Sequence, residues 1–64
     1  MKELTDRELD ICHLLAKGFS NKKIGKELGI EESSVKAVIW SINKKWKTDS
    51  RLQIAIKYIK GGGK

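Results

Sequence analysis

A glycine between two short helical patterns most restricts how this 64-residue chain can fold. Ile24 and Leu28 lie four residues apart, which predicts the apolar face of a helix over about 21–28. Gly29 follows at once, where a left-handed backbone conformation can end a helix without steric cost. A new helical pattern starts within a few residues, so the segment predicts a helix-turn-helix.

The second helix of this motif, over about 32–46, has one apolar and one outward face. Its expected inward residues are Val35, Val38, Ile39 and Ile42, and its expected outward residues are Lys36, Ala37, Trp40, Asn43 and Lys44. Gly25 lets another helix backbone approach closely, and Ile30 is expected to fill the angle between the helices. In DNA-binding proteins the second helix of such a motif enters the major groove. Periodicity alone leaves an ordinary helical hairpin as the alternative.

Two further helices flank the motif. Thr5 and Glu8 form a capping box, which starts a first helix at about Asp6, and Gly18 ends it. Its expected buried face consists of Leu4, Leu9, Ile11, Cys12, Leu14 and Leu15. The N-cap types Thr48, Asp49 and Ser50 introduce a fourth helix over about 50–60. We therefore predict an all-α, four-helix domain over residues 1–60, with a flexible Gly-rich tail over 61–64.

The predicted fourth helix is apolar on more than one side. One stripe consists of Leu52, Ile56 and Ile59, and the other of Ile54, Ala55 and Tyr58. A surface helix of this length needs only one stripe, so the other predicts a partner. We assign Ile54 and Tyr58 to the interface of a homodimer, which makes this the dimerisation helix.

The net charge of +6 and the pI near 9.7 predict an anionic partner, and double-stranded nucleic acid is the common one. A solvated lysine surface kept for solubility is the alternative. A chain of this size has no room for an enzyme cleft, and Cys12 and His13 stand alone, so no catalysis, metal or cofactor is expected. No apolar run is long enough to span a membrane, and we expect a cytoplasmic protein.

The residues from about Leu4 to Ala55 resemble the LuxR/GerE-type DNA-binding domain of bacterial transcription regulators. The resemblance is specific, because three separated blocks occur in the family's order and spacing. They contain Leu4 to Glu8, Ile11, Leu14, Ala16, Gly18, Ser20, Asn21, Lys22, Ile24, Leu28, Ile30, Ser34, Val35, Lys36, Ile42, Lys45 and Arg51. The resemblance implies a four-helix domain with a central helix-turn-helix and a last helix that often forms a two-fold dimer.

The resemblance also implies site residues. It places Lys36, Ala37 and Trp40 at the base-facing positions of the third helix, in agreement with the outward face read from the periodicity. It places Ser20, Asn21, Lys22, Ser34 and Lys45 at positions that touch the phosphate backbone. Lys23, where the family usually has Glu, and the outward Lys44 extend the predicted phosphate-binding set.

Other departures from the family pattern leave a second function open. Glu31 replaces a capping Ser, Val38 replaces His, and Trp46, which replaces Leu, is expected to plug the core against the fourth helix. An indole at position 40 either packs on thymine methyl groups or marks a protein partner. The alternative to a DNA-binding regulator is therefore a small interaction module, an anti-repressor or a polymerase adaptor, that uses Trp40 and the last helix. Region 4 of sigma factors shares some of these elements.

Overall fold

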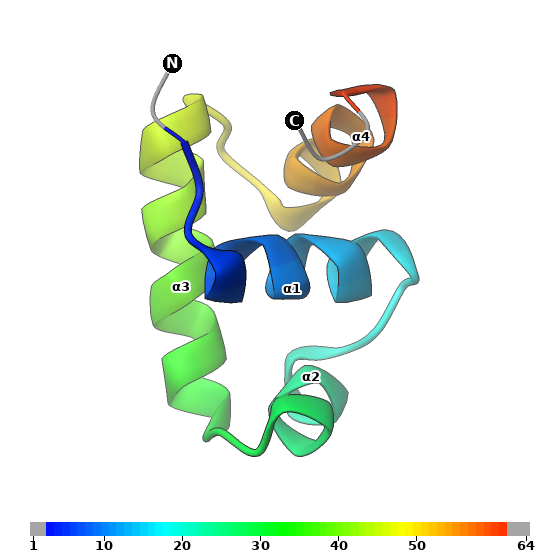
Figure 1. The fold of residues 1–64 in the computed structure, drawn as a ribbon, viewed down its shortest axis with the longest axis vertical. Helices are drawn as coiled ribbons and strands as arrows, with labels where there is room; N and C mark the ends of the chain where they lie inside the picture. The colour runs from blue at the N-terminus through cyan, green and yellow to red at the C-terminus, as the bar shows by residue number, and fades with distance from the viewer. Residues whose placement is uncertain (1–2, 62–64) are drawn as a thin grey trace.

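The computed structural model describes residues 3–61, and within them the chain forms four helices and no strand. The helices are α1 (Asp6–Ala16), α2 (Asn21–Leu28), α3 (Glu32–Trp46) and α4 (Arg51–Gly61). In Figure 1, α1 lies across the middle of the domain between α2 and α4, and α3 passes its N-terminal end. The predicted all-α, four-helix fold is confirmed. Gly61 is the last residue of α4, so the predicted tail is wrong at this residue, and 62–64 lie outside the described residues.

The first helix begins at the predicted capping box. The Thr5 hydroxyl accepts a hydrogen bond from the Glu8 backbone N–H at 3.1 Å, and the Glu8 carboxylate accepts one from the Thr5 N–H at 2.8 Å. These bonds satisfy two donors that an open helix end would leave free. The helix then packs against all three of the others, which makes it the centre of the domain.

The core is a single apolar cluster drawn from every helix. Its buried members are Ile11, Cys12, Leu14, Leu15, Ile24, Val35, Ile42, Trp46 and Ile54. Leu9 is only half-buried, and Trp46 lies in the core as expected. Burial raises the pKa of the Cys12 thiol to about 11, and the nearby Glu8 carboxylate adds to the rise. Cys12 is therefore a packing residue rather than a nucleophile.

The turn of the helix-turn-helix depends on two glycines. Gly29 adopts φ +70°, the left-handed conformation predicted for the end of α2. A Cβ atom on Gly25 would lie 2.7 Å from the Ile30 carbonyl oxygen, a contact that real side chains do not make. The closest approach at Gly25 is made by the turn, and the backbone nitrogen of Glu32, the first residue of α3, would lie 3.6 Å from the same Cβ atom.

The two apolar stripes of α4 are assigned the other way round by the structure. Ile54 is fully buried in the core, and Tyr58 packs against the same core, with its ring centroid 6.3 Å from that of His13. The prediction that Ile54 forms a dimer interface is wrong, because its side chain is covered by the domain's own helices, and Tyr58 lies on that inner side too. The exposed apolar residues of α4 are Leu52, Ile56 and Ile59.

Candidate nucleic-acid interface

The predicted base-facing residues share an exposed face of α3. Lys36, Ala37 and Trp40 are all exposed, while Val35 and Ile42 on the opposite face are fully buried. The Trp40 side chain is 63% exposed, which is high for the largest apolar side chain. Such an arrangement offers a donor, a methyl group and an aromatic ring side by side to a base-pair edge.

Lys44 lies one turn after Trp40 and covers part of its ring. The Lys44 ammonium is 4.6 Å from the ring centroid, a cation–π contact. The contact holds a positive charge beside the exposed indole. The pair thus presents an apolar surface with a cation at its edge.

A second group of predicted residues surrounds the N-terminus of α2. The Ser20 hydroxyl caps the helix by accepting a hydrogen bond from the Lys23 N–H at 3.2 Å. Lys22 and Lys23 are exposed, and the Lys23 ammonium lies 4.4 Å from the centre of the Phe19 ring. An open hollow of about 320 Å³ is lined here by Ser20, Lys22, Lys23, Lys26 and Glu27. A helix N-terminus ringed by lysines suits a phosphate group.

The Asn21 side chain is oriented by Arg51, the first residue of α4. Arg51 donates a hydrogen bond to the Asn21 side-chain oxygen at 2.7 Å and another to the Phe19 carbonyl at 2.6 Å. Because a guanidinium can only donate, the oxygen of the Asn21 amide must face Arg51. The amide NH₂ is the donor group that the Asn21 side chain keeps for other partners.

The structure separates Lys45 from the other predicted phosphate contacts. Its ammonium forms a salt bridge with the buried Glu8 carboxylate at 2.7 Å. The charge of Lys45 is thus paired within the fold, and its predicted contact with a phosphate stays a prediction. Ser34 is exposed near the start of α3, and Glu31 makes no side-chain cap bond to that helix.

Sequence reasoning missed Glu8 and Arg51 as residues that shape this surface. The capping box explains the contact of Glu8 with Thr5, but no local pattern indicates that the Glu8 carboxylate also reaches α3. Arg51 belonged to the family pattern, but its partners are about 30 residues away, at positions 19 and 21. Only the packed helices bring these groups together.

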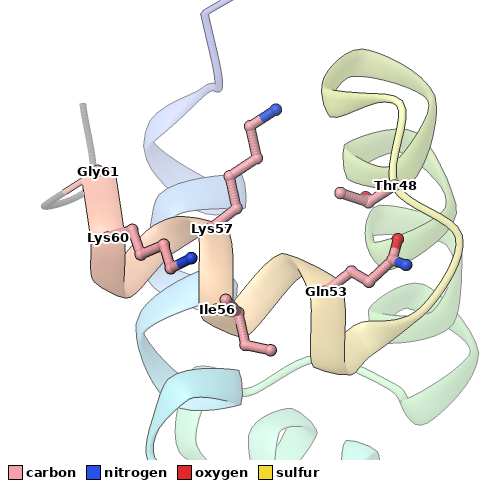
Figure 2. A pocket seen from close by; sticks show the side chains of 6 residues that line it. All are labelled: Thr48, Gln53, Ile56, Lys57, Lys60 and Gly61. Atoms are coloured by element: carbon pink, nitrogen blue, oxygen red, sulfur yellow. The ribbon is translucent and has the colours of Figure 1, made fainter.

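Two open hollows border α4. One, of about 510 Å³, lies beside α4 and the loop that joins it to α3, and is lined by Thr48, Gln53, Ile56, Lys57, Lys60 and Gly61 (Figure 2). The other, of about 370 Å³, includes Leu15, Phe19, Leu52 and Ala55 among its lining residues. The exposed Leu52 and Ile56 thus each border a hollow. Within residues 3–61 no three potential metal ligands gather, and no helix is long and apolar enough to cross a membrane.

Comparison with known proteins finds one matching family and several similar regulators. The family model for bacterial regulatory proteins of the luxR family (GerE) matches residues 2–58. The nitrate/nitrite response regulator NarP of Escherichia coli K12 is 42% identical over 60 residues, which cover 94% of this chain and 28% of that protein. NarL of the same strain is 43% identical over 56 residues, covering 88% of this chain and 26% of that protein.

A relative from a second organism is similar over the same part of the chain. The transcriptional regulatory protein LiaR of Bacillus subtilis is 44% identical over 55 residues, covering 86% of this chain and 26% of that protein. The chain thus spans about a quarter of the length of these relatives. Since the family model matches nearly the whole chain, the chain belongs to the luxR family of bacterial regulatory proteins.

Proposed function

We propose that this domain binds double-stranded DNA in a sequence-specific manner and regulates transcription, with α3 in the major groove. The observation that carries the proposal is the exposed face of Lys36, Ala37 and Trp40 beside the basic N-terminus of α2. Lys36 donates to guanine O6 or N7, and Ala37 and Trp40 pack on thymine methyl groups. The domain acts as a binding module in the cytoplasm and not as an enzyme.

The phosphate contacts are made by groups around the base-reading face. Ser20, Lys22, Lys23 and the Asn21 amide bind one strand at the α2 N-terminus, while Ser34 and Lys44 lie on α3. Phosphate contacts of this kind position the protein without reading sequence. Lys45 is not included, because it is paired with Glu8.

We further propose that the domain works as a homodimer through the outer face of α4. Leu52, Ile56 and Ile59 are 66%, 44% and 64% exposed and follow the i, i+4, i+7 spacing of a helix–helix contact. The hollows that Leu52 and Ile56 border could each receive an apolar side chain from a two-fold partner. So small a patch supports a weak dimer that is completed on an inverted repeat, with half-sites about one helical turn apart.

Selection of binding sites from random duplex DNA tests the proposal. The purified domain should enrich a short motif, and its affinity for that motif should fall steeply between about 50 and 200 mM salt. If no sequence is enriched and no duplex binds at about 50 mM salt, the proposed function is wrong.

A protein-interaction module is the second candidate, favoured by the 63% exposure of Trp40. Large exposed aromatic side chains are common anchors of protein interfaces. The variant Trp40→Ala separates the two functions. If the variant loses its base preference at one position of the DNA site, Trp40 reads DNA. If its DNA binding is unchanged but it no longer binds RNA polymerase, the domain is an interaction module.

A further inference from the structure

We propose that Glu8 is a positioning residue for the DNA-reading helix: its buried carboxylate sets the rotation of α3 and keeps the Lys45 charge off the DNA. This inference rests on the proposed DNA binding. It assigns to an acidic residue outside the helix-turn-helix a role in the choice between specific and non-specific DNA.

The Glu8 carboxylate joins three groups. One oxygen accepts hydrogen bonds from the Thr5 N–H at 2.8 Å and the Lys45 ammonium at 2.7 Å, and the other accepts one from the Ser41 hydroxyl at 3.0 Å. The Glu8 side chain is only 7% exposed, and that of Lys45 is 24% exposed. Buried charge-assisted bonds of this kind are short, directional and stronger than neutral ones.

These bonds hold α3 at two points one turn apart. Ser41 directly follows Trp40 in the sequence, and Lys45 lies four residues after Ser41 on the same side of the helix. The buried contacts of α3 with the core are apolar, through Val35, Ile42 and Trp46, and apolar contacts have no preferred direction. The hydrogen bond from Lys57 is accepted by the backbone carbonyl of the last residue of α3, beyond the turns that carry Lys36 and Trp40. The Glu8 carboxylate is therefore what determines how far α3 is rotated, and hence where Lys36 and Trp40 point.

The same carboxylate compensates a positive charge. Lys45 lies near the end of a helix that carries Lys36 and Lys44 on its exposed face. While it is paired with Glu8 it adds little to the attraction for phosphate. Once released, it would add one cation to a surface that attracts any DNA sequence.

The variant Glu8→Gln tests both parts of the inference, the rotation of α3 and the pairing of the Lys45 charge. It keeps the size of the side chain and removes its negative charge. The formal net charge rises by one from +6. Titrations against the selected motif and against random duplex give a specificity ratio, the affinity for the motif divided by the affinity for random duplex. This ratio should fall about tenfold, a loss comparable to that of one base contact. The salt slope on random duplex should steepen by up to about one unit.

Three further variants separate geometry from charge. Asp10→Asn removes a carboxylate from an exposed position of α1 and should leave the specificity ratio unchanged. Glu8→Asp keeps the charge but is too short to reach both partners, so it should lower the ratio without changing the salt slope. Ser41→Ala removes one bond at a half-buried position and should lower the ratio by a smaller factor.

Residual dipolar couplings of the DNA-free protein give a readout independent of binding. Glu8→Gln, or Ser41→Ala if the former does not fold, should change the orientation of α3 relative to α1. Unchanged couplings, or equal losses of specific and random binding with an unchanged ratio, would overturn the inference and leave Glu8 as a stabilising residue only. A wild type that selects no motif would instead overturn the proposed function.

Discussion

The Lys57 ammonium donates a hydrogen bond to the backbone carbonyl of Trp46, the last residue of α3, at 3.2 Å. It also lies 5.8 Å from the centre of the Trp46 ring. A cation at the C-terminus of a helix satisfies a free carbonyl and interacts favourably with the helix dipole. Lys57 therefore fastens α4 to the end of α3.

Replacing Lys57 by Ala should lower the free energy of unfolding by about 1 kcal/mol, because the bond to the Trp46 carbonyl is lost. Urea denaturation followed by circular dichroism measures the change. Lys60→Ala removes the same charge from the exposed end of α4 and should change the stability by less than about 0.5 kcal/mol. Equal effects of the two variants would show that the hydrogen bond is unimportant.

Lys47 ends α3 in the left-handed conformation, with φ 56°, although it is not glycine. The variant Lys47→Gly should raise the thermal midpoint, with a gain of about 0.5–1 kcal/mol, since glycine adopts this conformation without steric cost. Lys44→Gly removes the same charge from inside α3 and should instead cost about 1 kcal/mol. A destabilised Lys47→Gly would mean that the strain at this C-cap is negligible.

The pairing of Glu8 makes stability depend on pH. Burial alone would raise the pKa of the carboxyl, but the hydrogen bonds from Lys45, Thr5 and Ser41 outweigh it and hold the pKa below its ordinary value of 4.5. The folded state therefore binds a proton less readily than the unfolded state, so this stabilisation is present above pH 4.5 and is lost as the pH falls through the lowered folded pKa.

Denaturation of the wild type and of Glu8→Gln between pH 3 and pH 7 measures this contribution. The difference between their free energies of unfolding should shrink as the pH falls below about 4.5. Asp10→Asn serves as a control and should follow the wild type. A difference that is constant across the range would contradict the lowered pKa.

Aspartate substitutions on α4 distinguish its two stripes. Ile56→Asp and Ile59→Asp should leave the helical spectrum intact, because both side chains are exposed, yet reduce binding to an inverted repeat towards the affinity for a half-site. Ile54→Asp should unfold the domain, since it places an unpaired charge in the core at a cost of several kcal/mol. Full affinity of both exposed variants for the repeat would exclude this face as the dimer interface.

Two lysines should respond differently in DNA titrations. Lys36→Ala should cost about 1–3 kcal/mol on the selected motif and relax one base-pair position. Lys22→Ala should weaken binding to all sequences alike and reduce the salt slope by about one unit. An equal loss on every sequence for Lys36→Ala would reassign that residue to a phosphate contact.

Local patterns in the sequence are sufficient to predict the start of α1, the end of α2 and the exposed face of α3. The Thr5 capping box and the left-handed Gly29 act within a few residues, so their effects follow from local physical chemistry. The outward position of Lys36 follows from helical periodicity combined with the apolar residues around it. These features need no knowledge of the other helices.

The buried stripe of α4 and the pairing of the charged side chains depend on how the four helices pack together. Periodicity shows that a helix has two apolar stripes but not which of them meets α1, so Ile54 was assigned to the wrong side. Lys45 and Glu8 are separated by 37 residues, and Arg51 and Asn21 by 30. Such pairs form because the packing of helices brings distant residues together, and a local pattern carries no information about that packing.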